Sequence, residues 1–151
     1  MQIETESVQN ASLSPHEAGQ YSAAALAYLG DAVMEVLVRT MLVRRGVGNA
    51  GKLSALSLEY VRATAQSRGL EGILPHLTEE ELAVYHRGRN AAGAHPKSAS
   101  VTEYRRATGL EALVGYLYLC GAHDRLDTLF SLYTEYLLAQ KGGADRADEE
   151  K

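Results

Sequence analysis

The sequence predicts an all-α fold in a single domain, and three observations support this. First, the long segments repeat apolar residues every three or four positions, the spacing of one helix face. Second, no segment has the sustained apolar–polar alternation expected of a half-buried strand. Third, Gly and Pro divide the helical segments at short intervals, and 151 residues suit one domain. We therefore expect five or six helices with short connections.

Helix boundaries follow from capping residues and helix breakers. The first helix follows Ser14-Pro15, a cap and first turn, and it ends at Gly46. The third begins with Thr78-Glu79-Glu80-Glu81, a capping box, and an irregular loop containing Pro96 follows it. The predicted helices span residues 16–45, 52–68, 78–92, 102–120 and 124–140.

The ends of the chain differ in composition from its middle. Residues 1–15 are polar and are expected to be a flexible segment, and residues 142–151 are expected to be a disordered acidic tail. This leaves residues 16–141 as the folded domain. The acidic N-terminal segment matches neither a signal peptide nor a transit peptide, and no apolar run is long enough to span a membrane. We therefore expect a cytoplasmic protein without a membrane partner.

Three features resemble functional motifs but have simpler interpretations. Cys120 is the single cysteine and lies in an apolar run, which is typical of a small buried residue. Residues 46–51 spell GxGxxG, but a helix precedes them where a dinucleotide site needs a strand, so they indicate a helix end and a turn. His123-Asp124 is typical of the HD phosphohydrolases, yet Asp124 also suits the start of a helix.

Two carboxylates stand out because each lies in an apolar helix. Asp31 lies in the run 23–38 and Glu111 in the run 107–120, and burial of an unpaired carboxylate costs several kcal/mol or more. A divalent ion shared by both acids would remove this cost, and Gly30 and Gly115 would let the two helices approach closely. The alternative is that Asp31 faces solvent and Glu111 pairs with a cation.

Glu35 lies one turn after Asp31 and could extend the same site. It also precedes Arg39 by four residues, the favoured spacing for an ion pair on a helix surface. The ion pair is the favoured interpretation, and a role as metal ligand remains the alternative.

At these residues the sequence resembles the ribonuclease III family. Leu29-Gly30-Asp31-Ala32-Val33 matches the signature of the family's catalytic helix, and Glu111-Ala112-Leu113-Val114-Gly115 matches its second signature. The resemblance covers residues 22–140 and leaves no room for a double-stranded-RNA-binding domain. Together with Arg87-Gly88-Arg89-Asn90-Ala91 and Pro96-Lys97, this resembles the family's shorter branch, mini-ribonuclease III.

The resemblance implies a magnesium-dependent endoribonuclease that cleaves double-stranded RNA, with Asp31 and Glu111 as catalytic residues and Mg²⁺ ligands. It implies a homodimer in which each protomer cuts one strand and leaves a 5′ phosphate, with Tyr28 at the dimer interface. The implied natural substrate is the ends of the 23S (large-subunit) ribosomal RNA precursor. The sequence departs from full-length ribonuclease III where that family has further acids, because Ala24, Ala27 and Thr108 stand there.

Charge distribution points to the RNA contacts. The net charge is −4, but residues 86–106 hold five Lys and Arg residues against the single acid Glu103. A basic segment in an acidic chain is typical of a surface that contacts nucleic acid. The expected RNA contacts are Arg87, Arg89, Asn90, Lys97, Arg105 and Arg106.

Two rival functions remain open at this point. One is an inactive ribonuclease-III-like module that binds RNA or protein, which the presence of both Asp31 and Glu111 disfavours. The other is an HD-type phosphohydrolase acting on nucleotides. For the basic segment, the alternative is that Arg87 and Arg89 only cap or pair within their own helix.

Overall fold

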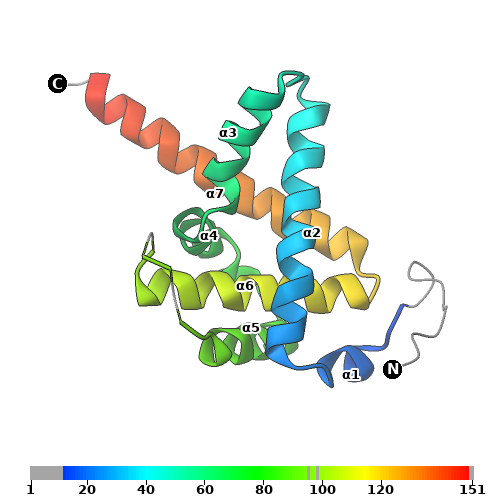
Figure 1. The fold of residues 1–151 in the computed structure, drawn as a ribbon. Coiled ribbons are helices and arrows are strands. Elements are labelled where there is room, and N and C mark those ends of the chain that lie inside the picture. Colours follow the sequence, from blue (N-terminus) through cyan, green and yellow to red (C-terminus); the bar gives the residue numbers. More distant parts are fainter. Residues whose placement is uncertain (1–11, 95, 98, 150–151) are drawn as a thin grey trace.

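The protein is a helical domain in which one central helix is surrounded by the others (Figure 1). The computed structural model describes residues 12–94, 96–97 and 99–149. Within these ranges there are seven α-helices, two short 3₁₀ helices and no strand, which confirms the predicted all-α class. In chain order they are α1 (Pro15–Gly19), α2 (Ala23–Arg44), α3 (Ala50–Val61), α4 (Ala63–Gly69), η1 (Leu70–Gly72), η2 (Leu74–His76), α5 (Glu79–Ala91), α6 (Val101–Leu119) and α7 (His123–Glu149).

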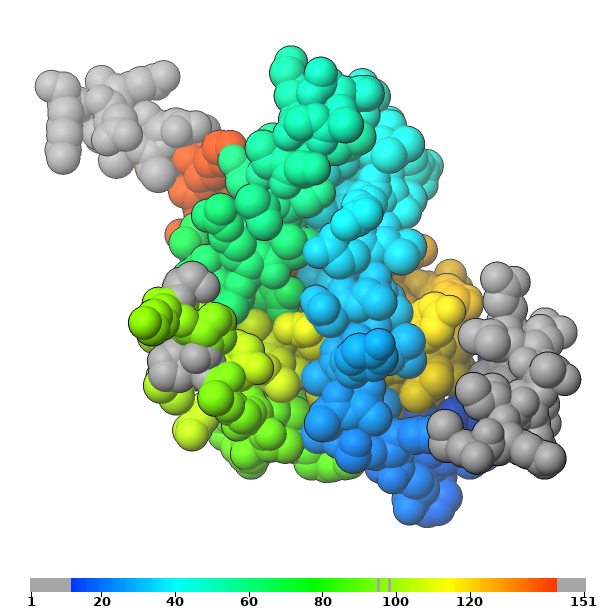
Figure 2. Space-filling view, viewed as in Figure 1, coloured from blue at the N-terminus to red at the C-terminus, as the bar shows by residue number. Residues whose placement is uncertain are grey.

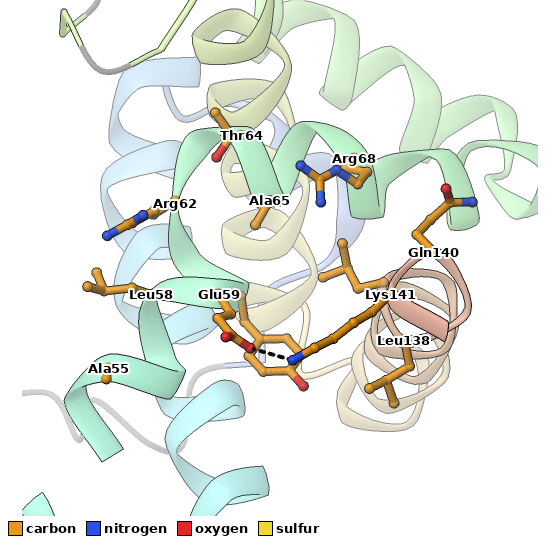
Figure 3. Close-up of a pocket in the computed structure, with 12 residues that line it drawn as sticks. Ala55, Leu58, Glu59, Arg62, Thr64, Ala65, Arg68, Leu138, Gln140 and Lys141 are labelled. Carbon is orange, nitrogen blue, oxygen red and sulfur yellow. Dashed lines mark ion pairs between the residues drawn. The ribbon is translucent and has the colours of Figure 1, made fainter. Parts of the chain in front are cut away.

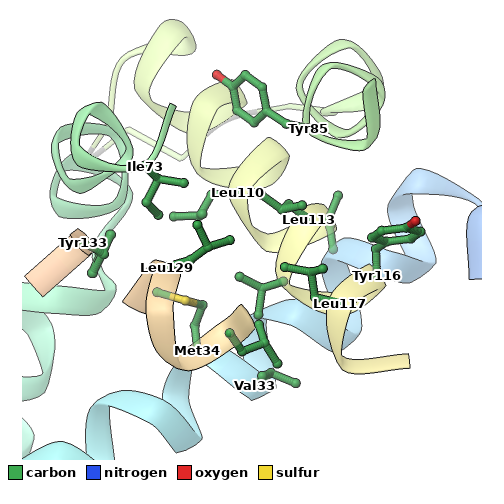
Figure 4. Close-up of a cluster of buried hydrophobic side chains, with 14 of the residues drawn as sticks. Val33, Met34, Ile73, Tyr85, Leu110, Leu113, Tyr116, Leu117, Leu129 and Tyr133 are labelled. Carbon is green, nitrogen blue, oxygen red and sulfur yellow. The ribbon is translucent and has the colours of Figure 1, made fainter. Parts of the chain in front are cut away.

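Helix α6 forms the centre of the core. It packs against α2, α4, α5 and α7, and Figure 1 shows α2 crossing it. Buried side chains from α2, α6 and α7 form one cluster, and Figure 4 shows Met34, Leu113 and Leu129 as examples from the three helices. Neighbouring helices cover residues 107–120 on several sides, and this explains why the run is apolar around most of the helix.

The prediction of one continuous helix over residues 16–45 was wrong, because this segment forms two helices, α1 and α2, with a turn between them. Ser22 adopts an extended conformation and its hydroxyl accepts a hydrogen bond from the backbone N–H of Ala25. The guanidinium of Arg87 then donates to the carbonyls of Gly19 and Tyr21. The N-cap Ser22 and the guanidinium of Arg87 therefore stabilise a turn between α1 and α2, although the apolar pattern of the sequence continues through it.

The predicted helix over residues 52–68 is likewise two helices. Arg62 is extended, with ψ of 148°, and separates α3 from α4. The side-chain amide of Gln66 donates to the carbonyl of Val61 at 3.1 Å, which satisfies an acceptor at the end of α3. The two breaks turn the five predicted helical spans into seven α-helices within the described residues.

Parts of the two end segments fall within the described residues. The backbone N–H of Leu13 donates to the carbonyl of Leu119, and Ser14 forms a capping box with Glu17. Helix α7 continues to Glu149, beyond the predicted end at residue 140 and through the segment 142–149 that we expected to be disordered. The rest of the predicted flexible ends, residues 1–11 and 150–151, lies outside the described residues, as does His95.

The capping motifs confirm the remaining helix starts. Thr78 and Glu81 form the predicted capping box of α5, and Ser100 forms one with Glu103 at the start of α6. Gly46 ends the segment after α2 with φ of +88°, and Asn49 caps α3, so residues 46–49 form the connection and residues 50–51 begin α3. No helix among the described residues is long and apolar enough to cross a membrane.

Candidate active site

The site is built where α2 crosses α6 at two glycines. A Cβ atom on Gly30 would lie 1.7 Å from the carbonyl oxygen of Glu111, and one on Gly115 would lie 2.0 Å from the carbonyl oxygen of Leu26. Any larger residue at either position would push the helices apart. The close approach that the sequence predicted from these glycines is confirmed.

This crossing brings Asp31 and Glu111 together. They come from different helices, 80 positions apart in the sequence, and both line one cleft of about 440 Å³. Asp31 is exposed to solvent and Glu111 is half-buried behind it. The arrangement combines one accessible and one recessed carboxylate at the same opening.

The two carboxylates repel each other. Burial is the main cause that raises the pKa of Glu111 to about 8, and the charge of Asp31 and a hydrogen bond between the two side chains raise it further. The raised pKa favours the protonated form of Glu111 at neutral pH. A divalent cation at the same place would favour loss of that proton.

The cleft lining fits a magnesium ion held by two carboxylates. Ala24, Ala27 and Thr108 stand where full-length ribonuclease III has further acids, and all three line the cleft. The small side chains leave space beside Asp31 and Glu111. Magnesium keeps several waters and commonly takes only one or two carboxylates, so this donor set suits it.

Sequence reasoning missed other residues of the cleft. Tyr104 lies on the same face of α6 as Thr108 and Glu111, at intervals of four and three residues, and it lines the cleft with them. Gly88 and residues 91–93 supply the opposite wall from the end of α5 and the following loop. The spacing 104–108–111 was the available signal for Tyr104.

Glu35 forms the surface ion pair that the spacing predicted. Its carboxylate accepts a hydrogen bond from the guanidinium Nε of Arg39 at 3.1 Å. It does not line the cleft that contains Asp31 and Glu111.

Two of the predicted RNA contacts are already engaged within the protein. Arg87 donates to the carbonyls that precede α2, at 3.1 and 2.9 Å. Arg106 donates to the hydroxyl and carbonyl oxygens of Ser67 and pairs with Glu71. Both side chains therefore hold helices together, and their contact with RNA stays a prediction.

The other predicted contacts have different surroundings. Asn90, Lys97 and Arg105 are exposed, and they lie at the end of α5, in the loop and at the start of α6. The guanidinium of Arg89 lies 6.0 Å from the centre of the Tyr85 ring, a cation–π distance. These four side chains border the segments that form the cleft wall.

Helix α2 presents an uncovered apolar face. Tyr28 is 87% exposed and Val36 63% exposed, and Figure 2 shows α2 as a ridge on the surface. Ala32 is exposed between them, so the three lie at intervals of four on one side of the helix. Tyr28 also lines the cleft, so the face and the site are adjacent.

The simpler interpretations of His123-Asp124 and Cys120 agree with the structure. Helix α7 begins at His123, which places Asp124 in the first turn. Cys120 is half-buried at the end of α6, and burial raises the pKa of its thiol. Within the described part of the chain, no group of three or more His, Cys, Asp or Glu residues could hold a metal ion.

Comparison with known proteins adds an independent line of evidence. Residues 24–122 match the model of the ribonuclease III domain. The chain is 46% identical over 140 residues to a mini-ribonuclease 3 from Desulfitobacterium hafniense, covering 91% of this chain and 89% of that protein. It is also 48% identical over 113 residues to a mini-ribonuclease 3 from Symbiobacterium thermophilum, covering 74% and 87%.

A solved structure shows the same arrangement of helices. A crystal structure of a protein from Fusobacterium nucleatum superimposes with a TM-score of 0.71 at 31% sequence identity. The match covers 77% of this chain and 93% of that chain.

Proposed function

This chain belongs to the ribonuclease III family and is an endoribonuclease, and we propose that it cleaves double-stranded RNA in the cleft between α2 and α6 with magnesium. The single observation that carries the proposal is that Asp31 and Glu111 line one cleft. The family match leaves no support for the HD-type alternative.

In this proposal the two acids have distinct tasks set by their surroundings. Asp31 is exposed and would be the first ligand that an entering ion meets, while the recessed Glu111 would exchange its proton for the ion. A bound magnesium ion supplies Lewis-acid activation of the scissile phosphate and of an attacking water. The rigid contact of Gly30 with Glu111 would fix the separation of the two ligands.

The proposed natural substrate is the precursor of 23S ribosomal RNA, cut near its ends in the cytoplasm. This finer assignment rests on the resemblance of the two signature segments around Asp31 and Glu111. Of the predicted RNA contacts, the exposed Asn90, Lys97 and Arg105 have the freest side chains, and Arg89 lies beside them.

We further propose a homodimer formed through the apolar face of α2. The exposed side chains of Tyr28, Ala32 and Val36 form a stripe that a second copy would cover. Because Tyr28 also lines the cleft, the partner would lie next to each active site. Dimerisation would therefore shape the opening that RNA enters.

Sedimentation at micromolar concentration tests the dimer. We expect twice the mass of the 16.3 kDa chain. Tyr28→Asp should give a folded monomer, because it places a charge within the proposed interface, whereas Val43→Asp, farther along the same helix, should have a smaller effect. A wild-type protein that sediments as a monomer would contradict this part of the proposal.

Cleavage assays test the function itself. A perfect RNA duplex, the separate single strands and free nucleotides are each incubated with the protein, with and without magnesium. We expect cleavage of the duplex alone, dependent on magnesium and absent in Asp31→Asn. Binding of the duplex without any cleavage would instead support an inactive RNA-binding module.

A further inference from the structure

A second hollow lies away from the cleft, between α4 and the C-terminal part of α7. This α4 groove has a volume of about 720 Å³ and is lined by the end of α3, by α4 and by α7 (Figure 3). Figure 3 shows Arg62 at the start of α4 and Arg68 near its end, with Lys141 projecting from α7 below them. The groove is larger than the cleft that holds Asp31 and Glu111.

Among the described residues, cations outnumber acids in the lining of the α4 groove. It contains three cations and one acid, and Lys141 pairs with the acid Glu59 at 3.5 Å. Arg62 and Arg68 are exposed and form no ion pair or side-chain hydrogen bond within the described ranges. Arg87 and Arg106, by contrast, are bound to backbone and side-chain acceptors.

The α4 groove is held in a fixed position relative to the catalytic helix. Arg106 on α6 binds Ser67, the residue next to Arg68, and it also pairs with Glu71 just after α4. Arg106 is five residues before Glu111, so the same helix positions the cleft and α4. The neighbouring Arg105 is exposed and forms no ion pair with the described residues.

The spacing and chemistry of the lining suit a nucleic-acid backbone. Arg68 lies six positions after Arg62, which caps the start of α4, and six positions correspond to about 9 Å along a helix axis. Two arginine side chains at that separation can each bind a phosphate, and the exposed Leu58 and Leu138 offer apolar contact to sugars. An acidic peptide would also be attracted by charge, but the fixed link to the catalytic helix favours the substrate.

We propose that the α4 groove is an additional RNA-binding surface, in which Arg62 and Arg68 hold phosphates of the duplex away from the cleaved bond. This inference rests on the proposed cleavage of double-stranded RNA and extends its contacts beyond the basic segment 86–106. The surface would position the duplex without reading its sequence, because phosphates are the same in every sequence.

The test uses the full chain carrying Arg62→Gln and Arg68→Gln together. The control variant carries Arg44→Gln and Arg45→Gln, which removes the same charge from exposed positions at the end of α2, outside both lining sets. Binding of an end-labelled RNA duplex is measured over a salt series without magnesium, and cleavage is measured with magnesium. Thermal melts and sedimentation of all proteins accompany these measurements.

We expect the groove variant to bind about tenfold more weakly and its salt dependence to flatten by about two units, one for each lost phosphate contact. The control should match the wild type, and the melting temperature should change in neither variant. An unchanged salt slope in the groove variant, with a wild type that still cleaves duplex RNA, would overturn the groove and leave the proposed function standing. A wild type that neither binds nor cleaves duplex RNA would overturn both, and a change in sedimentation alone would reassign the groove to contact between protein copies.

Discussion

At the crossing of α2 and α6 the helix backbones are in direct contact, whereas the α4 groove is lined in part by the exposed side chains of Arg62 and Arg68. Gly30 has no room for even a methyl group, while Arg62 and Arg68 extend into open space. The difference shows that Gly30 fixes the relative position of two helices, whereas Arg62 and Arg68 do not. The two acids proposed as catalytic, Asp31 and Glu111, lie at this rigid crossing, whereas the cations proposed to hold the substrate are exposed side chains.

The crossing should be the part of the molecule least tolerant of change. Gly30→Ala places a methyl group against the Glu111 carbonyl, so we expect a loss of about 3 kcal/mol or more in unfolding free energy. For a domain of this size that corresponds to a fall in Tm of about 6–12 °C. Differential scanning calorimetry would measure it.

Gly48→Ala is the matched control, because nothing lies within 4 Å of a Cβ atom at that position. We expect its Tm to stay near that of the wild type. If both variants melted alike, the crossing would not be the rigid element described above.

An ion pair of intermediate importance joins α5 to α7. The guanidinium of Arg125 donates to both carboxylate oxygens of Glu81, at 2.9 and 2.7 Å, and this hydrogen bonding is the main cause that lowers the pKa of Glu81. The contribution of Glu81 to stability is therefore present above its ordinary pKa of 4.5 and is lost as the pH falls through the lower folded-state value.

We expect Glu81→Gln to cost about 1–3 kcal/mol at neutral pH, because the variant leaves the Arg125 charge poorly compensated. The same change should flatten the loss of stability in acid, measured by urea unfolding at a series of pH values. Glu80→Gln alters the exposed neighbouring residue and should leave both quantities unchanged. Equal acid sensitivity of wild type and Glu81→Gln would show that this pair is not responsible.

The smallest effect is expected at the Glu35–Arg39 pair. It is exposed, with Arg39 73% accessible, and pairs at this spacing contribute about 0.3–0.5 kcal/mol. Glu35→Gln should therefore change Tm by about 1–2 °C at most and should not change the cleavage rate. A large loss of cleavage in this variant would return Glu35 to the catalytic site.

The sequence predicted the features that depend on local signals. Capping residues marked the starts of α5 and α6, and the apolar runs around Asp31 and Glu111 marked the two acids. Gly30 and Gly115 indicated that the two helices meet, because small residues permit close packing. In each case the signal lay within a few residues of the feature.

Features that depend on distant partners could not be predicted in this way. The breaks after Gly19 and at Arg62 interrupt apolar patterns that continue across them, and Arg87 stabilises the first break from 66 residues away. The sequence predicted that Arg106 contacts RNA, but in the structure its guanidinium donates to the hydroxyl of Ser67, 39 residues away. The α4 groove joins segments from α3, α4 and α7, so no single segment carries its signal.

The most direct test of the central claim is a double-mutant cycle on the two acids of the crossing. Asp31→Asn, Glu111→Gln and the double variant are compared with the wild type for cleavage of an RNA duplex with magnesium. If both acids act on one shared ion, each single variant should lose at least about three orders of magnitude in rate, and the double variant should lose little more. Circular dichroism should show that all three remain folded. Near-normal cleavage by either single variant, or losses that multiply in the double variant, would contradict a shared site at Asp31 and Glu111.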